Sequence, residues 1–249
     1  MESLRKTLNI LEVFLTNGGA VSLSEIAEAT QLNIGTIHGI VSYLRERGYL
    51  IQTEKRGKYS LGYKFLDYGD MIMINNPINE IALPFMKKLN QLTRETVNLA
   101  IIFKNTSVVI GRVESSHDLR VVGKSEREAQ LYCTGLGKVL LAYKSEEYWE
   151  RYSSKVSFKP YTSYTITKYD QLKKELINIR NNGYGIDNQE TGLGIINIAA
   201  PIRDSNEEVV ASTGILGPTV RINESNLQEL IKAVKKCASE ISSALGSKN

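Results

Sequence analysis

Hydrogen-bonding and small side chains gather between Ser24 and Tyr43 of this 249-residue chain. From Ile34 to Glu46 the apolar residues fall on one side at helical spacing, and the opposite side is small or polar. Such a side lets the backbone approach a partner closely, as a helix entering the DNA major groove must. An ordinary solvated face is the alternative, but a helical glycine costs about 1 kcal/mol relative to alanine. The candidate contacts are Ser24, Asn33, Gly35, Thr36, His38, Gly39, Ser42 and Tyr43.

Cations form a second group of candidate contacts, at the tip of an expected hairpin. Two short strand-like runs can pair across residues 54–57, which leaves Lys55, Arg56 and Lys58 at or beside the tip. Three cations there suit contacts to DNA phosphates, while a soluble edge hairpin with protective lysines is the alternative. Residues 45–58 carry five Lys/Arg against two Asp/Glu, whereas the whole chain has a net charge of only +4. The charge therefore points to DNA locally rather than through the chain as a whole.

A third candidate site is the expected helix start at Thr134, Gly135, Leu136 and Gly137. A Walker nucleotide loop is excluded, because Val139 stands where that loop needs Ser or Thr. With Thr134 as the N-cap, the free backbone N–H groups and the helix dipole can hold a carboxylate. A tight turn into a buried helix is the alternative.

The remaining reactive residues form no catalytic or metal-binding set. Asp187 and Glu190 are a carboxylate pair in a glycine-flanked segment that we expect to be a mobile loop, but neither has a His or Lys neighbour in sequence. No nucleophile, base and orienting group come together, so the sequence favours a binding protein over an enzyme. Cys133 and Cys237 stand far apart without metal-type spacing, which predicts free thiols and no metal site. We also expect no cofactor.

The helices and the hairpin that carry these two groups of candidate DNA contacts indicate a winged helix-turn-helix over residues 1–62. Three amphipathic helices precede the hairpin. Ser22 and Glu25 predict a capping box at the second helix, and Asn33 predicts the N-cap of the third. Residues 63–76 predict a linker helix. Its apolar surface, formed by Phe65, Leu66, Ile72 and Met73, serves either self-association or packing on the next domain.

Residues 77–249 predict an α+β domain. A long helix opens it and hairpins lie near both ends with helices between, which favours an antiparallel sheet covered by helices. We expect a short extra strand over residues 119–122 and a polar helix over 169–181 capped by Thr167. A leader segment and an apolar run of about 20 residues are both missing from the sequence. The chain is therefore expected in the cytoplasm, without a membrane partner.

Longer motifs spread along nearly the whole chain carry a family resemblance. They are Leu23-x-Glu25-Ile26-Ala27, Thr36-Ile37-His38, Thr134-Gly135-Leu136-Gly137-Lys138 and the distinctive Gly185-x-Asp187-x-x-Glu190-x-x-x-Gly194-x-x-x-Ile198-Ala199-Ala200-Pro201-Ile202. With them the chain resembles the IclR family of bacterial and archaeal transcription regulators. The resemblance implies a winged helix, a linker helix that dimerises and a C-terminal effector-binding domain similar to GAF and PAS domains.

The resemblance further implies a regulator that binds a double-stranded DNA operator as a dimer or dimer of dimers, under control of a small carboxylic or sugar acid. The alternative is a metabolite-sensing enzyme or ligand-binding protein that uses its N-terminal domain only for assembly. The effector contacts implied by the resemblance are Thr134, Gly135, Leu136, Gly137, Asp187, Asn197, Gly214 and Leu216.

The sequence departs from the family pattern at a few of these positions. Family members usually carry arginine where Gly39 stands and often cysteine where Asn197 stands. Glyoxylate-responsive members have serine at the positions of Gly214 and Leu216. The departures concern one DNA contact and the effector, and they leave the expected fold unchanged.

Overall fold

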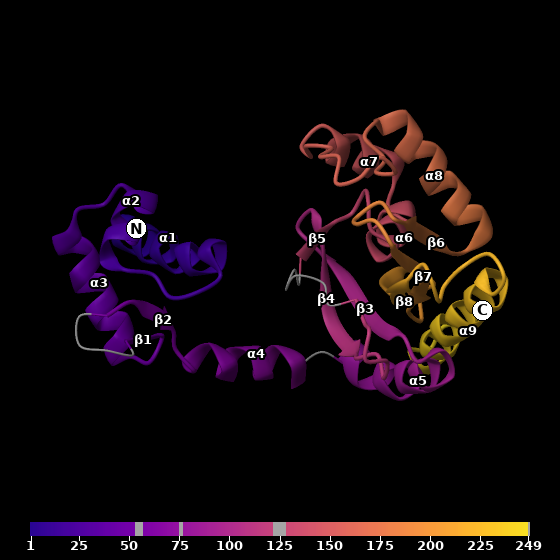
Figure 1. The fold of residues 1–249 in the computed structure, drawn as a ribbon, viewed down its shortest axis with the longest axis horizontal. Helices are drawn as coiled ribbons and strands as arrows, with labels where there is room; N and C mark the ends of the chain where they lie inside the picture. Colours follow the sequence, from indigo (N-terminus) through magenta and orange to yellow (C-terminus); the bar gives the residue numbers. More distant parts are fainter. Residues whose placement is uncertain (53–56, 75–76, 122–127, 249) are drawn as a thin grey trace. The chain divides into compact units, whose positions relative to one another are not determined.

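The computed structural model describes residues 1–52, 57–74, 77–121 and 128–248, and it divides into two units, Met1–Asn75 and Asn76–Asn249 (Figure 1). Lys55 and Arg56, two of the expected phosphate contacts, lie outside the described residues. The helix that we expected as a linker groups with the first unit. The separate linker segment over residues 63–76 stays a prediction.

The first unit is a helix cluster with a small hairpin and a trailing helix. Its core includes Ile10, Ile26, Ile37 and Val41, which are each fully buried. This arrangement confirms the expected winged helix-turn-helix. In chain order the elements are α1 (Glu2–Asn17), α2 (Leu23–Thr30), α3 (Ile34–Glu46), β1 (Leu50–Gln52), β2 (Tyr59–Leu61) and α4 (Lys64–Ile74).

Local capping places the starts of α2 and α3 where the sequence predicts them. The Ser22 N–H donates to Glu25 Oε2 at 2.6 Å and the Glu25 N–H donates to Ser22 Oγ at 3.2 Å, which confirms the capping box. Asn33 Oδ1 accepts the N–H of Thr36 at 2.8 Å. Ile34, expected on the buried face, is 56% exposed, because as the first residue of α3 it extends past the core.

The wing is fastened to the helices at two levels. Strands β1 and β2 pair antiparallel, and the buried Leu50 and Tyr59 enter the helical core. Tyr59 also exchanges backbone hydrogen bonds with Val21, directly before α2. The wing therefore has a defined position beside the start of α2 and the end of α3.

Aromatic rings join α4 to the end of α3. The Phe65 ring lies edge-on to the Tyr49 ring, with 5.5 Å between centroids, and the Tyr68 ring stacks on Tyr49 at 6.1 Å. The Tyr49 and Tyr68 hydroxyl oxygens lie 2.7 Å apart. Phe65, which the sequence placed on the apolar surface of the linker helix, thus packs within its own unit.

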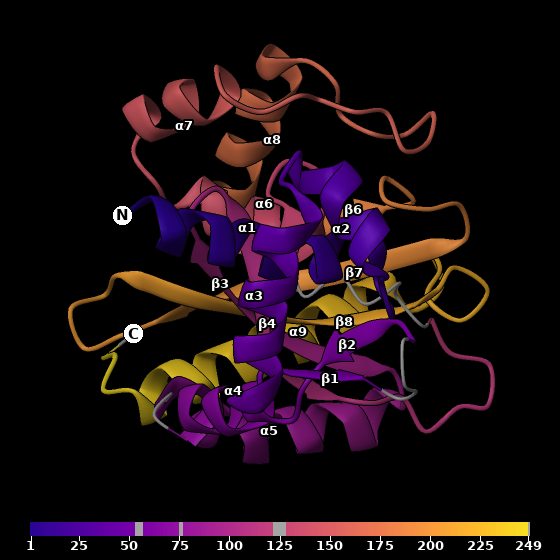
Figure 2. The same cartoon turned by 90° about the vertical axis from the view of Figure 1, so that its left-hand side faces the viewer.

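The second unit is built on one six-stranded antiparallel sheet with the order β5-β4-β3-β8-β7-β6 among the described residues. Figure 2 shows α6, α7 and α8 on one side of this sheet and α5 and α9 on the other. The α+β class is therefore confirmed. The elements are α5 (Pro77–Thr93), β3 (Thr96–Phe103), β4 (Thr106–Val113), β5 (Glu128–Gln130), α6 (Gly135–Ala142), α7 (Glu146–Ser153), α8 (Tyr169–Asn182), β6 (Gly185–Asn188), β7 (Ile195–Arg203), β8 (Val209–Pro218) and α9 (Leu227–Ala244).

Two local expectations for this unit are wrong. The described part of the expected strand, residues 119–121, is not a strand, because β5 occupies the free edge of β4 instead. Thr167 does not cap α8, because the helix begins at Tyr169 and Lys168 takes the N-cap position without a side-chain hydrogen bond. Among the described residues no helix is both long and apolar enough to cross a membrane.

Candidate nucleic-acid interface and ligand site

The exposed side of α3 is formed by small and polar residues, as the sequence predicts. Gly35, His38, Gly39 and Tyr43 are exposed, and Thr36 and Ser42 are half-buried. A Cβ at position 39 would meet no atom within 4 Å, and one at position 35 would meet only the Asn33 side chain at 3.5 Å. Neither glycine is therefore required by packing against the described residues.

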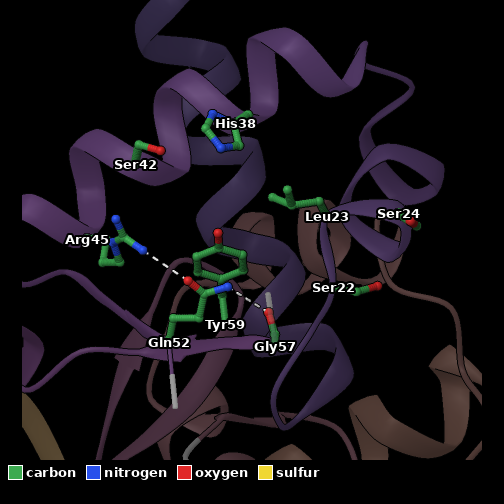
Figure 3. A pocket seen from close by; sticks show the side chains of 9 residues that line it. All are labelled: Ser22, Leu23, Ser24, His38, Ser42, Arg45, Gln52, Gly57 and Tyr59. Carbon is green, nitrogen blue, oxygen red and sulfur yellow. Dashed lines mark hydrogen bonds between the residues drawn. The ribbon is translucent and has the colours of Figure 1, made fainter. Parts of the chain in front are cut away.

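A concave pocket of about 460 Å³ lies between the start of α2, the side of α3 and the wing (Figure 3). Three of its residues, His38, Ser42 and Arg45, follow one another along α3 at helical spacing. Ser24 lines it from α2, which brings one more predicted contact to the same place. The lining is Ser22, Leu23, Ser24, His38, Ser42, Arg45, Gln52, Gly57 and Tyr59.

Lys58, the one expected tip cation that the structure describes, is already paired. Its Nζ lies 2.9 Å from Glu25 Oε1, and both side chains are about half-exposed, at 55% and 42%. The Ser22 backbone N–H and the Lys58 ammonium together lower the pKa of Glu25 to about 2. The capping box of α2 and the wing therefore share one carboxylate.

The sequence analysis counted Arg45 within the cationic segment 45–58 but named neither Arg45 nor Gln52 as a contact. Arg45 Nη1 donates to Gln52 Oε1 at 2.9 Å, and Gln52 Nε2 donates to the Gly57 carbonyl at 2.9 Å. Arg45 lies seven residues after His38, and this spacing alone could have found it. The Gln52 contact depends on how the wing folds back, so no sequence signal announces it.

At the start of α6 the backbone N–H groups of Leu136 and Gly137, which the sequence analysis expected to be free, have protein partners. Thr134 Oγ1 accepts the Gly137 N–H at 3.0 Å, which confirms Thr134 as the N-cap. The Leu136 N–H donates to Asn197 Oδ1 at 3.0 Å, and Asn197 Nδ2 donates to the Ile215 carbonyl at 2.7 Å. A Cβ at Gly135 would lie 2.5 Å from Asn197 Oδ1, so glycine is needed there for this close approach.

Several of the implied effector contacts lie in one row across the sheet, on the face that α6 covers. Asp187 of β6 is opposite Asn197 of β7, and Asn197 is opposite Leu216 of β8. Gly214 follows on the same face of β8, but a Cβ there would lie 2.2 Å from the Ile198 carbonyl oxygen. The structure thus gathers Leu136, Asp187, Asn197 and Leu216, while the backbone of β7 fills the space above Gly214.

The buried carboxylates beside this row are held by the protein itself. Asp187 accepts the Glu190 N–H and the Thr191 hydroxyl, each at 2.6 Å, so the expected mobile loop is a hydrogen-bonded turn. Glu190 accepts from Lys138, which also donates to Glu175 at 3.0 Å. Burial raises the pKa of Asp187 and raises that of Glu190 to about 7.

Two protein-family models cover most of the chain. The IclR helix-turn-helix domain matches residues 3–54, and the model described as bacterial transcriptional regulator IclR C-terminal matches residues 72–243. The chain belongs to the IclR family. The family's helix-turn-helix match covers α1 to β1, and its C-terminal match covers the sheet with its helices.

Individual relatives agree with this membership. The chain is 30% identical over 246 residues to the HTH-type transcriptional regulator KdgR of Escherichia coli K12. The aligned region covers 99% of this chain and 93% of KdgR. It is similar to the crystal structure of the Thermotoga maritima IclR, with 34% identity, a TM-score of 0.78 and 99% of each chain covered. An IclR homologue from Microbacterium hydrocarbonoxydans, complexed with 4-hydroxybenzoate, shares the fold with a TM-score of 0.84 over 98% of each chain at 22% identity.

Membership in the IclR family defines the class of this protein. It is a DNA-binding transcription regulator with an N-terminal helix-turn-helix and a C-terminal, GAF-like effector-binding domain. The family consists of transcription regulators rather than enzymes, so the hypothesis of a metabolite-sensing enzyme is wrong.

Proposed function

We propose that this IclR-family protein controls transcription in the cytoplasm by binding a double-stranded operator with an affinity set by a small carboxylic or sugar acid. The observation that carries the proposal is the row of Asp187, Asn197 and Leu216 against the start of α6. This row combines a carboxylate, an amide and an apolar group beside the positive end of a helix. An acid with hydroxyl or keto groups fits that combination.

Asn197 links the proposed ligand site to the packing of α6 on the sheet. Its Oδ1 already accepts the Leu136 N–H, so a ligand carboxylate that binds this donor must displace the amide. The displaced amide would also leave the Ile215 carbonyl of β8. Ligand binding would thus change how α6 is held to the sheet, and a change of this kind can be passed on as a shift between two states.

The effector proposal is tested by titrating sugar acids, short keto acids and aromatic acids into the protein bound to its operator. The wild type is compared with Asp187→Ala and Asn197→Ala by fluorescence anisotropy of labelled DNA. We expect an acid of the first two classes to change operator affinity, and both substitutions to alter that response. If only aromatic or uncharged ligands act, or if both variants respond like the wild type, the pocket assignment is wrong.

On the DNA side we propose a division between base and phosphate contacts. Thr36, His38 and Ser42 read base edges in the major groove, and Lys58 contacts a phosphate after leaving Glu25. His38→Ala should then reduce the preference for operator over random DNA. Lys58→Ala should weaken both DNAs alike and reduce the slope of log affinity against log salt by about 0.9. The other expected phosphate contacts are Lys55 and Arg56.

Lys6→Ala is the matched control for Lys58→Ala. Lys6 pairs with Glu2 at 2.8 Å on the outside of α1, so its loss removes the same charge from an exposed ion pair elsewhere in the unit. Its salt slope should equal that of the wild type. Equal effects of His38→Ala and Lys58→Ala on operator and random DNA would refute the proposed division.

We further propose a homodimer or a dimer of dimers. Leu66 and Met71 on α4 are 62% and 59% exposed, and Leu4 and Leu15 on α1 are 60% and 74% exposed. The side chains of Ile72 and Met73, which the sequence placed on the same surface, lie outside the described ones. Sedimentation equilibrium at micromolar concentration should show a species heavier than 27.8 kDa. A monomer that binds its operator tightly would overturn the proposal.

A further inference from the structure

The pocket between α2, α3 and the wing contains an arginine that is held by the wing. Arg45 extends from the last turn of α3, and within the described residues its guanidinium donates only to Gln52. Gln52 is in turn fastened to the Gly57 carbonyl, at the root of the wing tip (Figure 3). A guanidinium has five N–H donors, so most of its donors are available to something that enters the pocket.

The rest of the pocket is also suited to an anion. Ser24 and Ser42 present hydroxyls, His38 presents an imidazole, and none of the described residues that line the pocket is acidic. The start of α2 adds the positive end of a helix dipole. The Glu25 carboxylate, in the first turn of α2, accepts the Ser22 N–H of its own capping box.

The position of the pocket indicates which anion can reach it. A sugar-phosphate strand separates the two grooves of a DNA duplex. If α3 lies in the major groove and the wing reaches the neighbouring groove, that strand must pass between them, across the pocket. Phosphate is therefore the group that the geometry brings to Arg45.

We infer that this pocket holds one phosphate of the DNA backbone, with Arg45 as the contacting side chain and Gln52 as the residue that aims it. The inference rests on the proposed DNA binding by α3 and the wing. Because Gln52 belongs to β1, the wing sets the direction of the Arg45 guanidinium. Without the wing, Arg45 at the end of α3 would not be aimed at this phosphate.

Loss of the side chain tests the contact. Arg45→Met keeps the apolar stem and removes the charge, so affinity for operator and random duplex should each fall roughly tenfold or more, as expected for a charged hydrogen bond. The slope of log affinity against log salt should fall by about 0.9. Arg151→Met removes one arginine from the exposed surface of α7 and should change neither quantity.

Gln52→Ala tests the positioning role. It leaves every charge in place, so the salt slope of its binding should stay close to that of the wild type while affinity falls. In the Arg45→Met background the same substitution should have no further effect, because there is no guanidinium left to aim. Additive losses in this double-mutant cycle would overturn the role of Gln52, since a merely structural residue would act in both backgrounds.

The outcomes separate this inference from the proposal on which it rests. A wild-type protein that binds no duplex refutes the proposed DNA binding. A wild-type protein that binds its operator, together with Arg45→Met binding with unchanged affinity and salt slope, refutes only the phosphate pocket. Far-ultraviolet circular dichroism of each variant shows whether the helices are retained. Arg45→Lys keeps the positive charge but loses the planar set of guanidinium donors, so it should retain the salt slope and lose affinity.

Discussion

Lys58 in the wing and Lys138 in α6 each join a glutamate far away in sequence, but in opposite surroundings. Lys58 lies 2.9 Å from Glu25, and the two side chains are 55% and 42% exposed. The Lys138 side chain is 2% exposed and donates to Glu190, which is 7% exposed. Both pairs tie distant segments together, but only the first is exposed to water.

Hydration decides what each pair contributes. An exposed ion pair adds about 0–1 kcal/mol to stability, so a DNA phosphate can compete with Glu25 for Lys58 at small cost. A buried lysine loses its hydration and needs several partners, and Lys138 has Glu175, Glu190 and the Ile186 carbonyl. Lys58 thus stays exposed in the wing, whereas Lys138 is committed to the fold of the effector domain.

Removing the buried lysine should give the largest effect. Lys138→Met leaves the Glu190 carboxylate without its cation and should lower the free energy of unfolding by about 3–5 kcal/mol. Trp149, the only tryptophan of the chain, is buried in α7, so its fluorescence in urea reports on this domain.

Lys173→Met is the control for that prediction. Lys173 pairs with Glu146 at 2.7 Å in the same domain, but both side chains are exposed, at 36% and 54%. Its loss should cost less than about 1 kcal/mol. Similar losses for the two lysines would remove the contrast between buried and exposed pairs.

Asn197→Ala should give the next largest effect. It leaves the buried Leu136 N–H and the Ile215 carbonyl without their partner, which costs about 1–3 kcal/mol for an unsatisfied buried group. The urea midpoint of Trp149 fluorescence should fall at an unchanged slope. An unaltered midpoint would mean that water replaces the amide, and α6 would then be open to ligands without displacement of a side chain.

Measuring stability as a function of pH tests the effect of burial on Glu190. Burial raises the pKa of Glu190 from its ordinary value near 4.5 to about 7. The folded protein therefore retains a proton that the unfolded chain releases in this window, and the stability contributed by this group is lost as pH rises from 4.5 to 7. Urea titrations at several pH values should show this fall in the wild type and a flatter profile in Glu190→Gln. If the stability of the wild type and that of Glu190→Gln change with pH in parallel, the raised pKa does not belong to Glu190.

The smallest expected effect on stability comes from the titration of the exposed Glu25 carboxylate. The Ser22 backbone N–H first, and Lys58 second, lower the pKa of Glu25 to about 2, so the contribution of this group is present above pH 4.5 and is lost as pH falls toward 2. Carboxyl-detected NMR should follow this titration directly. In Lys58→Ala the pKa should rise but stay below its ordinary value, because the Ser22 hydrogen bond remains. A full return to the ordinary value would assign the whole shift to Lys58.

Local rules explain what could be predicted from the sequence. The caps at Ser22, Asn33 and Thr134 lie where predicted, since each depends on residues within one helical turn. The buried side of α3 follows from its periodicity, and Ile34 departs from it only because periodicity does not show where a core ends. Thr167 does not cap α8, because the helix begins one residue later than that cap requires and Lys168 takes the N-cap position.

The candidate sites were predicted only in part. The exposed side of α3 follows from helix geometry, but the Arg45–Gln52–Gly57 chain requires the wing to fold back beside α3. In the same way Leu136 and Asn197 meet only when α6 lies on β7.

The sequence by itself determined the helices, the caps at Ser22, Asn33 and Thr134, the antiparallel sheet and the family. These depend on short spacings and on motifs that can be read along the chain. The tertiary structure alone decided that Lys138 meets Glu190 and that Asn197 occupies the Leu136 N–H. The physical reason is that a buried polar group must find a partner once water is excluded, and which partner it finds depends on which faces pack together.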